Sequence, residues 1–216
     1  MLEALCPHTI RQIEQGLVAG LHVKRRRTSE PVVLAMIGLT GSGLSSVARE
    51  LGSRLGWTVI EKNKIRVELR ERGPGFKPVT TDGVFYAMAK RVLAEHGNAI
   101  LDSDFADRAK RRRLERFVLR WQGRVLYLRV ICERDVMLER ILRARYDSKH
   151  DIFKSAAIAV REHTRRYPWH YRWSTAEGGR YTLRRPPTNI FAEVDTTAER
   201  QWKKRLLAVA ERLGRL

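Results

Sequence analysis

An unbroken apolar run, PVVLAMIG at residues 31–38, leads directly into a glycine-rich segment, GLTGSGLSS at residues 38–46. The run is rich in Val and Ile, and its length is typical of a strand that is buried on both faces of a parallel sheet. The residues that follow place Val47, Leu51 and Leu55 on one face of a helix that ends at a glycine. The order strand, glycine loop, helix constrains the fold more than any other feature of the chain.

The alternation of strands and helices continues to the end of the chain. Apolar runs predict further strands at 57–61, 98–105, 124–132 and 188–197. Helical spacing predicts helices at 63–72, 80–97, 108–123, 133–147, 151–166 and 198–216, the second of them capped by Thr80, Thr81 or Asp82. A polar and aromatic stretch at 167–188 carries no predicted element. The alternation predicts an α/β fold with a mostly parallel five-stranded sheet and helices on both faces.

Residues 1–30 differ in pattern from the rest of the chain. Within 8–23, the residues at helical spacing are Ile10, Ile13, Leu17 and Leu21. The polar segment KRRRTSEP follows, and Pro31 marks its end. We therefore expect 1–30 to form an amphipathic helix and a basic linker, and 31–216 to form one domain.

The charge of the chain is strongly positive. Lys and Arg number 43 against 24 Asp and Glu in 216 residues, a formal charge of +19. This excess implies polyanionic partners, such as nucleic acid, an anionic membrane surface or phosphorylated ligands, with a solvated basic surface as the alternative. The helix at 108–121 is rich in Arg, and RRYPWHYRW at 165–173 mixes cations with aromatic rings. Such mixtures suit phosphate contacts and base stacking, but they also suit aromatic rings packed on the body with arginines outside.

Neither a membrane span nor a disulfide framework is expected. The longest apolar stretch, VVLAMIGL, is far shorter than the roughly 20 residues of a spanning helix, and the first residues lack the features of a secretory signal. We therefore expect a cytoplasmic protein. The two cysteines, Cys6 and Cys132, lie far apart in the sequence, and Cys132 follows an apolar run that predicts a buried, inert thiol.

The glycine-rich segment almost matches a phosphate-binding loop, whose pattern is G-x-x-x-x-G-K-[S/T]. Glycines let successive backbone N–H groups converge on a phosphate, and the following helix adds its free N–H groups and the positive end of its dipole. The predicted ligand is therefore a nucleotide, ATP, with Mg²⁺ held by the hydroxyl of Ser45. The residues predicted to bind it are Gly38, Gly41, Ser42, Gly43, Leu44, Ser45 and Ser46. A tight turn without a ligand is the alternative.

Leu44 occupies the position of the lysine in this pattern. That lysine spans the β- and γ-phosphates and offsets the charge that develops during transfer, whereas leucine neither donates a hydrogen bond nor carries charge. Loss of one preorganised donor costs on the order of 3 kcal/mol, which is about a hundredfold or more in rate. We expect nucleotide binding to suffer less than transfer, because the backbone cradle needs no side chain.

Four further segments, together with the strand and loop at 32–46, resemble P-loop kinases of the AAA-type small-kinase group, which includes polynucleotide kinase and zeta-toxin-like relatives. They are VIEKNKIRVEL at 59–69, AILDSDFADRAKRRR at 99–113, CERDVMLERILRAR at 132–145 and EVDTTAE at 193–199. The resemblance covers residues 31–213 and implies a three-layer P-loop NTPase fold with a lid region at about 133–188. Each later segment is a weak match alone, and their order and spacing carry the resemblance.

The resemblance implies a role for particular residues. Asn63 stands where such kinases have the acidic residue that accepts the proton of the acceptor hydroxyl, and an amide cannot act as that base. Arg66 would contact the acceptor or the transferred phosphoryl group, and Asp102 would act near Mg²⁺ or the acceptor. Arginines of the lid would clamp the nucleotide phosphates, the candidates being Arg140, Arg143 and Arg145. For each arginine, a solvated surface position is the alternative.

The two replacements, Leu44 and Asn63, fall on the two most demanding positions of the implied reaction. Lys62, Lys64 or a lid arginine could supply the missing charge, and Glu61 or Glu68 could serve as the base. Three hypotheses follow: a nucleotide-binding protein with impaired or lost phosphotransferase activity, an active kinase of a small molecule or nucleic-acid end, and a basic nucleic-acid-binding module on a P-loop scaffold. The sequence favours the first.

Overall fold

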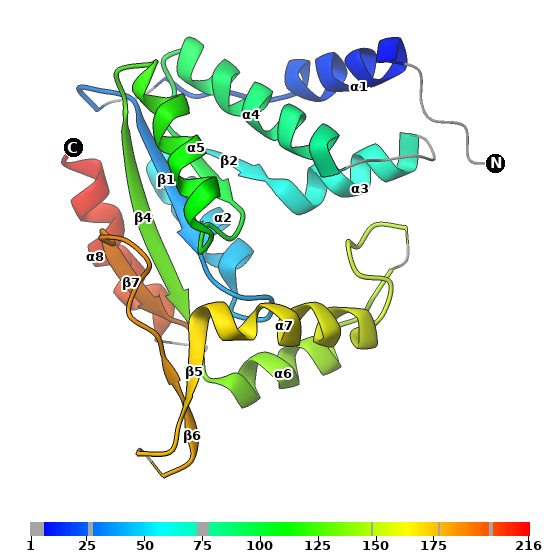
Figure 1. Cartoon of the computed structure of the whole chain (residues 1–216). Coiled ribbons are helices and arrows are strands. Elements are labelled where there is room, and N and C mark those ends of the chain that lie inside the picture. Colours follow the sequence, from blue (N-terminus) through cyan, green and yellow to red (C-terminus); the bar gives the residue numbers. More distant parts are fainter. Residues whose placement is uncertain (1–6, 26–27, 73–77, 148, 177, 199–200) are drawn as a thin grey trace.

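The computed structural model describes residues 7–25, 28–72, 78–147, 149–176, 178–198 and 201–216. Its strands are β1 (Val32–Ile37), β2 (Thr58–Glu61), β3 (Ala99–Asp102), β4 (Arg124–Ile131), β5 (Tyr171–Ser174), β6 (Arg180–Leu183) and β7 (Ala192–Asp195). Its helices are α1 (Pro7–Ala19), α2 (Leu44–Leu55), α3 (Lys62–Arg72), α4 (Pro78–Ala94), α5 (Arg108–Leu119), α6 (Arg134–Arg143), α7 (Ala156–His170) and α8 (Trp202–Gly214). Figure 1 shows their arrangement.

A five-stranded parallel sheet forms the centre of the molecule, in the order β2-β3-β1-β4-β7. Every residue of β1 is buried, because this strand pairs on both edges and is covered on both faces. The chain order reverses between β1 and β3, and ligands of open α/β sheets bind beyond the carboxyl ends of the strands at such a point. The glycine loop follows β1, and the acidic turn follows β3, so this topology brings both to one place.

Helices cover both faces of the sheet. One core lies between the sheet and helices α1, α3, α4 and α5, with Phe85 and Leu114 among its buried residues. The other core lies between the sheet and helices α2 and α8, with Leu51 and Leu206 buried in it. The three layers confirm the predicted fold class.

Helices α6 and α7 and the β5–β6 hairpin lie beyond the carboxyl end of the sheet (Figure 1). Met137 and Tyr167 pack with Leu39 in a third, smaller core, which attaches α6 and α7 to the glycine loop. Cys132 is buried, as predicted, and belongs to the same core. The region between residues 133 and 188 is therefore docked on the loop.

Two sequence predictions about elements were wrong. Helix α4 begins at Pro78, so Thr80, Thr81 and Asp82 lie inside the helix and do not cap it. Proline fits the first helical position, because its missing N–H would have had no partner there. The stretch 167–188 contains the last turn of α7 and the antiparallel β5–β6 hairpin. Helix α7 continues through Pro168, and burial of Tyr167 and His170 holds its last turn in place.

The predicted N-terminal helix is present as α1, and it packs on the same core as the domain. Leu17 and Leu21 contact the cluster that α4 and α5 also bury. The side chains of Ile10 and Ile13, and all of Cys6, lie outside the described residues. The division into 1–30 and 31–216 stays a prediction.

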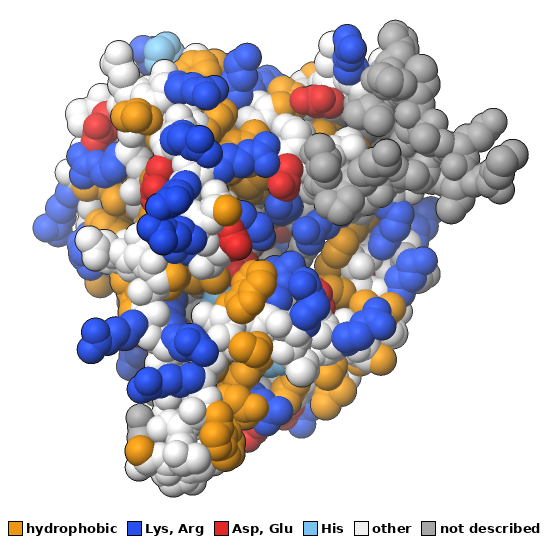
Figure 2. Space-filling view, viewed as in Figure 1, with side chains coloured by type: hydrophobic (Ala, Val, Ile, Leu, Met, Phe, Trp, Pro, Cys, Tyr) orange, Lys and Arg blue, Asp and Glu red, His pale blue; other side chains and the backbone are white. Residues whose placement is uncertain are grey.

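Lys and Arg side chains are scattered over the whole visible face of the molecule in Figure 2, without forming one continuous track. Within 165–173, Trp169 and Trp173 are exposed, whereas Tyr167 is buried and stacks on the ring of Tyr171 at 4.5 Å. Nucleic-acid binding therefore stays a prediction. Among the described helices, none is long and apolar enough to span a membrane.

Candidate nucleotide and acceptor site

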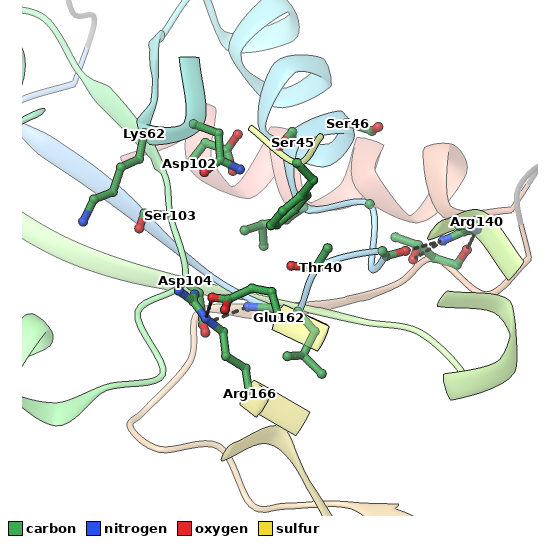
Figure 3. A pocket seen from close by; sticks show the side chains of 18 of the residues that line it. Thr40, Ser45, Ser46, Lys62, Asp102, Ser103, Asp104, Arg140, Glu162 and Arg166 are labelled. Atoms are coloured by element: carbon green, nitrogen blue, oxygen red, sulfur yellow. Dashed lines mark hydrogen bonds and ion pairs between the residues drawn. The ribbon is translucent and has the colours of Figure 1, made fainter. Parts of the chain in front are cut away.

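A cavity of about 460 Å³ lies at the carboxyl end of the sheet, at the place where the chain order reverses. Its walls come from the glycine loop with the start of α2, the end of β3, and helices α3, α5, α6, α7 and α8. Figure 3 shows Arg140 at one side of this cavity and Lys62 at the other, with Asp102 and Asp104 between them. We call the side with the glycine loop (Gly38–Ser46), Arg140 and Thr196 the loop end. We call the side with Lys62, Arg66, Lys110 and Arg166 the cation end.

The loop end is shaped by backbone conformations that glycine adopts readily. Gly41 and Gly43 have φ angles of 89° and 78°, in the left-handed region. A Cβ at Gly41 would also lie 2.7 Å from the carbonyl oxygen of Met137. Gly43 precedes α2 without any side-chain cap, so the first N–H groups of that helix have no partner within the helix. Gly43, Leu44, Ser45 and Ser46 line the cavity, as a phosphate cradle requires.

Leu44 lines the cavity but packs as an apolar residue. Its side chain is partly buried against the core shared by α2 and α8. It also lies over Gly38, where an added Cβ would be only 2.9 Å from Leu44 Cδ1. The position that holds a cation in the phosphate-loop pattern is therefore filled by a hydrocarbon, and the loop end lacks a charged group on the loop itself.

Ser45 and Asp102 form the polar pair between the two ends. Ser45 and Asp102 line the cavity together, and the carboxylate of Asp102 is buried at the end of β3. Burial raises the pKa of Asp102 to about 6, and the nearby carboxylate of Glu61 adds to the rise. The polar Ser45 hydroxyl nearby and the charges of Arg49 and Lys64 oppose the rise in pKa. A hydroxyl beside a carboxylate is an oxygen-only donor set, which Mg²⁺ prefers.

Arg140 braces the loop end against the last strand. Its guanidinium donates to the Thr196 carbonyl oxygen at 2.6 Å, to Thr196 Oγ1 at 3.2 Å and to the Gly41 carbonyl oxygen at 3.5 Å. The Thr196 hydroxyl in turn donates to the carbonyl oxygen of Ser42 at 2.7 Å.

Arg143 lies elsewhere: its side chain is 80% exposed and pairs with Glu139 at 2.8 Å, away from the cavity walls. Arg145 is also exposed.

The cation end gathers four basic side chains from three helices. Lys62 and Arg66 come from α3, Lys110 from the first turn of α5, and Arg166 from α7. The pKa of Lys62 is lowered by burial and by the charges of Arg66 and Arg166, although its ion pair with Asp82 opposes this. Burial together with Lys62 and Arg166 likewise lowers the pKa of Lys110. The four cations are thus close enough to repel one another.

Asp104 and His170 form a buried pair that holds α7 against the acidic turn. His170 Nε2 lies 3.1 Å from Asp104 Oδ2, and Asp104 Oδ1 accepts from the N–H groups of Ala106 at 3.0 Å and Gly38 at 3.3 Å. Burial alone would raise the pKa of Asp104, but the hydrogen bond and charge of His170 bring it below its usual value. On the same helix, His163 Nδ1 donates to the carbonyl oxygen of Thr40 at 2.9 Å. His170 therefore joins α7 to the acidic turn after β3, and His163 joins it to the glycine loop.

Asn63 and Arg66 line the cavity together, three residues apart on α3, as the predicted motif required. Arg66 Nη1 donates to Asn63 Oδ1 at 3.1 Å. Glu61, a suggested substitute base, pairs instead with Arg49 at 2.5 Å and with Lys64 at 2.8 Å, and it does not line the cavity. The roles of Asn63, Arg66 and Asp102 stay predictions.

The polar cavity residues that the sequence did not predict include Asp104, Lys110, Glu162, Arg166 and Thr196. Asp104 and Lys110 fall inside a segment that the resemblance to P-loop kinases covers, so their position after β3 could have identified them. Glu162 and Arg166 lie on α7, four residues apart and thus on one helix face, and no motif marks them. Only the docking of α7 reveals them.

This loop, sheet order and cavity define a P-loop nucleoside triphosphatase fold of the kinase type. A protein from Chloroflexus aurantiacus J-10-fl assigned as a kinase has a similar structure, with a TM-score of 0.60, 19% identity, and coverage of 86% of this chain and 97% of its own. The adenosine phosphosulfate (APS) kinase CysC of Mycobacterium tuberculosis follows with a TM-score of 0.54, 14% identity, and coverage of 86% and 99%. A gluconokinase from Sinorhizobium meliloti 1021 has a TM-score of 0.50, 17% identity, and coverage of 88% and 96%.

A family model described as an AAA domain matches residues 33–168, which is more than half of the chain. The chain belongs to this AAA domain family. The match includes the glycine loop, Asn63, Arg66 and Asp102, and it ends within α7. Among curated proteins, none matches the chain in sequence.

Proposed function

We propose that the chain binds ATP with Mg²⁺ at the loop end and transfers its terminal phosphoryl group only slowly to an acceptor in the same cavity. The observation that supports this most is the buried carboxylate of Asp102, which lines the cavity together with Ser45 and the start of α2. A glycine turn with no ligand would have no use for a buried carboxylate at that place.

Each group at the loop end has a distinct task in this proposal. The N–H groups of Gly43, Leu44 and Ser45 bind phosphate oxygens, and Ser45 with Asp102 holds the ion. When bound, Mg²⁺ neutralises phosphate charge. Arg140 keeps the loop open by binding the Gly41 and Thr196 carbonyl oxygens. Because these acceptors already engage its guanidinium, Arg140 acts mainly by positioning the loop.

Slow transfer follows from Leu44 and Asn63. Without an ammonium group at residue 44, the transition state loses on the order of 3 kcal/mol of stabilisation. Without a carboxylate at residue 63, transfer loses a general base, worth roughly 10²- to 10⁴-fold. Asp104 also lines the cavity, but its two oxygens already accept from Gly38, Ala106 and His170. It is therefore a poor substitute for the base.

An active kinase is the second candidate, and the cation end favours it. Lys62 lines the cavity, so its ammonium group could neutralise the phosphate charge that a lysine at residue 44 would otherwise neutralise. Lys64 is exposed and pairs with Glu61, which makes it unsuited to the same task. The two candidates differ in how far a lysine at residue 44 would raise the rate of phosphoryl transfer.

Substitution of Leu44 by Lys separates the candidates. We expect wild type to bind Mg²⁺–ATP in calorimetry, and Leu44→Lys to raise the rate of phosphoryl transfer by about a hundredfold, with a smaller effect on binding. The double variant Leu44→Lys with Asn63→Asp should raise the rate further. Leu119→Lys is the matched control, because Leu119 is 72% exposed on α5 and far from the loop in the fold.

The outcomes are distinct. If wild type already transfers the phosphoryl group of ATP, and Leu44→Lys does not change that rate, the active kinase is favoured. Absence of both heat and thermal shift when Mg²⁺–ATP is added to wild type overturns the proposed function altogether.

A further inference from the structure

The cation end has more positive charge than its protein surroundings neutralise. Among the described residues, Lys62 pairs with Asp82, and Arg166 pairs with Glu162 at 2.6 Å. Within the part of the chain that the structure describes, the one hydrogen bond of the Arg66 guanidinium goes to the neutral amide of Asn63. For Lys110, the described part of the chain supplies no ion-pair partner.

The available carboxylates are already engaged. Asp82 is shared between Lys62 and Arg113, the second at 3.6 Å. Glu162 also binds Arg165 at 2.8 Å. Asp104 is held by His170 and two backbone N–H groups, as described above. Among the described residues, Arg66 and Lys110 are therefore partly buried cations at a cavity wall that form no ion pair. The charges of Asp82 and Glu162 still act on Arg66, and those of Asp104 and Asp107 act on Lys110, in each case after the repulsion from neighbouring cations.

Such an arrangement costs folding free energy unless a ligand compensates it. Partial burial weakens hydration of a cation, and like charges nearby add repulsion. Both effects lower the pKa of Arg66, through burial and the charge of Arg166, just as they lower those of Lys62 and Lys110. Groups so placed bind an oxyanion favourably, because the anion removes the repulsion and accepts several charge-assisted hydrogen bonds.

The position of these cations separates them from the nucleotide cradle. Arg140 and Lys62 lie at opposite sides of the cavity in Figure 3, and Asp102 and Asp104 lie between. The backbone N–H groups of the loop already serve one phosphate chain at the loop end. The cation end thus has charge for a second anion, in a cavity of about 460 Å³ that both ends share.

We propose that the cation end binds the oxyanion of a small phosphomonoester, so that the molecule facing the nucleotide already carries a phosphate. Arg66 and Lys110 are its main ligands, and Lys62 and Arg166 add charge beside them. That this phosphomonoester is the acceptor of the phosphoryl group rests on the proposed function; that it binds here does not.

The test measures a second anion on the nucleotide-loaded protein. Wild type is first saturated with Mg²⁺ and AMPPNP, which occupies the loop end, and is then titrated with glycerol 3-phosphate, inorganic phosphate or glycerol in a calorimeter. We expect glycerol 3-phosphate and inorganic phosphate to bind at one site per chain, and glycerol to give no heat. Binding should weaken as salt concentration rises, because it is electrostatic.

Variants locate the site. Arg66→Ala and Lys110→Ala should each weaken glycerol 3-phosphate binding about tenfold, as loss of one charge-assisted hydrogen bond predicts, while AMPPNP binding stays within about twofold. Arg112→Ala is the matched control: it removes an exposed cation of the same helix, two residues from Lys110, that does not line the cavity. It should change neither affinity.

Three results would overturn the inference. The first is that no second anion binds to the AMPPNP-loaded protein. The second is that Arg66→Ala and Lys110→Ala weaken AMPPNP as much as glycerol 3-phosphate, which would assign these cations to the nucleotide. The third is that a 5′-phosphorylated DNA oligomer binds much more tightly than glycerol 3-phosphate and loses affinity equally with Arg112→Ala, which would indicate a nucleic-acid surface.

Failure of the proposed function gives a different result. If AMPPNP does not bind wild type, the nucleotide proposal is wrong, and glycerol 3-phosphate is then titrated into the unliganded chain. Loss of that binding in Arg66→Ala and Lys110→Ala, but not in Arg112→Ala, would still support the phosphomonoester site. Its absence would overturn this inference as well.

Discussion

The two ends of the cavity present different groups to a ligand: backbone at one end and charged side chains at the other. The loop end relies on backbone: the left-handed glycines Gly41 and Gly43 and the uncapped start of α2. The cation end relies on side chains from α3, α5 and α7, such as Lys62, Lys110 and Arg166. A backbone cradle tolerates replacement of one side chain, as Leu44 illustrates, whereas each substitution at the cation end alters the charge that a ligand meets.

The difference suggests which property each end controls. The geometry of the loop depends on φ angles and on the brace of Arg140 and Thr196, so we expect nucleotide binding to persist when side chains change. The charge at the other end depends on how helices dock, so we expect ligand preference to reside there. The predictions below test this division, from the largest effect to the smallest.

Gly41→Val should have the largest effect. Valine would have to adopt a φ of 89°, and its Cβ would lie 2.7 Å from the Met137 carbonyl oxygen. We expect a loss of about 3 kcal/mol in the free energy of unfolding and at least a hundredfold loss in AMPPNP affinity. Chemical denaturation and calorimetry measure the two quantities.

The control for Gly41→Val is Gly83→Ala. Gly83 lies within α4, and a Cβ there meets no atom within 4 Å, so alanine should stabilise the chain by roughly 0.5–1 kcal/mol. Nucleotide affinity that survives Gly41→Val in a folded protein would contradict a backbone-built loop end.

Asp102 should make Mg²⁺–nucleotide binding depend on pH. Its pKa is raised to about 6, so the carboxylate is ionised at pH 7.5 and mostly protonated at pH 5. Because the ion requires the charged form, we expect affinity for Mg²⁺–AMPPNP to fall about tenfold between these pH values. Titrations across this range measure the change.

Asp102→Asn isolates the contribution of Asp102 to this pH dependence, since the nucleotide phosphates titrate in the same pH range. The variant should bind Mg²⁺–AMPPNP about tenfold more weakly than wild type at pH 7.5, and it should lose the part of the pH dependence that Asp102 supplies. Asp135→Asn removes a carboxylate whose side chain is 95% exposed and should behave like wild type. Identical pH profiles for wild type and Asp102→Asn would exclude Asp102 as the ion's ligand.

The lid arginines should give the smallest effects. Arg143→Ala removes an exposed side chain that pairs only with Glu139 among the described residues. We therefore expect the free energy of unfolding to fall by less than about 0.5 kcal/mol, with no change in AMPPNP affinity. Arg140→Ala removes the hydrogen bonds to Thr196 and Gly41 and should lower the free energy of unfolding by about 1–2 kcal/mol. Thermal denaturation of the two variants measures this difference. Equal effects of the two substitutions would contradict a stabilising role for the contacts of Arg140 with Thr196 and Gly41.

Much of the fold could be predicted because its signals are local. The continuous apolar run of β1, the left-handed glycines and the helical spacing of Val47 and Leu51 are properties of neighbouring residues. Two prolines lie in helices beyond the bounds predicted from the sequence: Pro78 begins α4, and Pro168 lies inside α7. In the second case burial of Tyr167 and His170 outweighs the local preference.

The sequence by itself determined the parallel sheet, the glycine loop and the apolar residue at position 44, because strand burial, positive φ angles and a missing charge can be read from adjacent residues. Only the tertiary structure decided that Lys62, Arg66, Lys110 and Arg166 share one cavity wall, and that Arg143 does not. These side chains lie up to about a hundred residues apart. Pairing of β2 and β3 beside β1, and the docking of α7 on the loop, bring them together, and no local pattern contains that information.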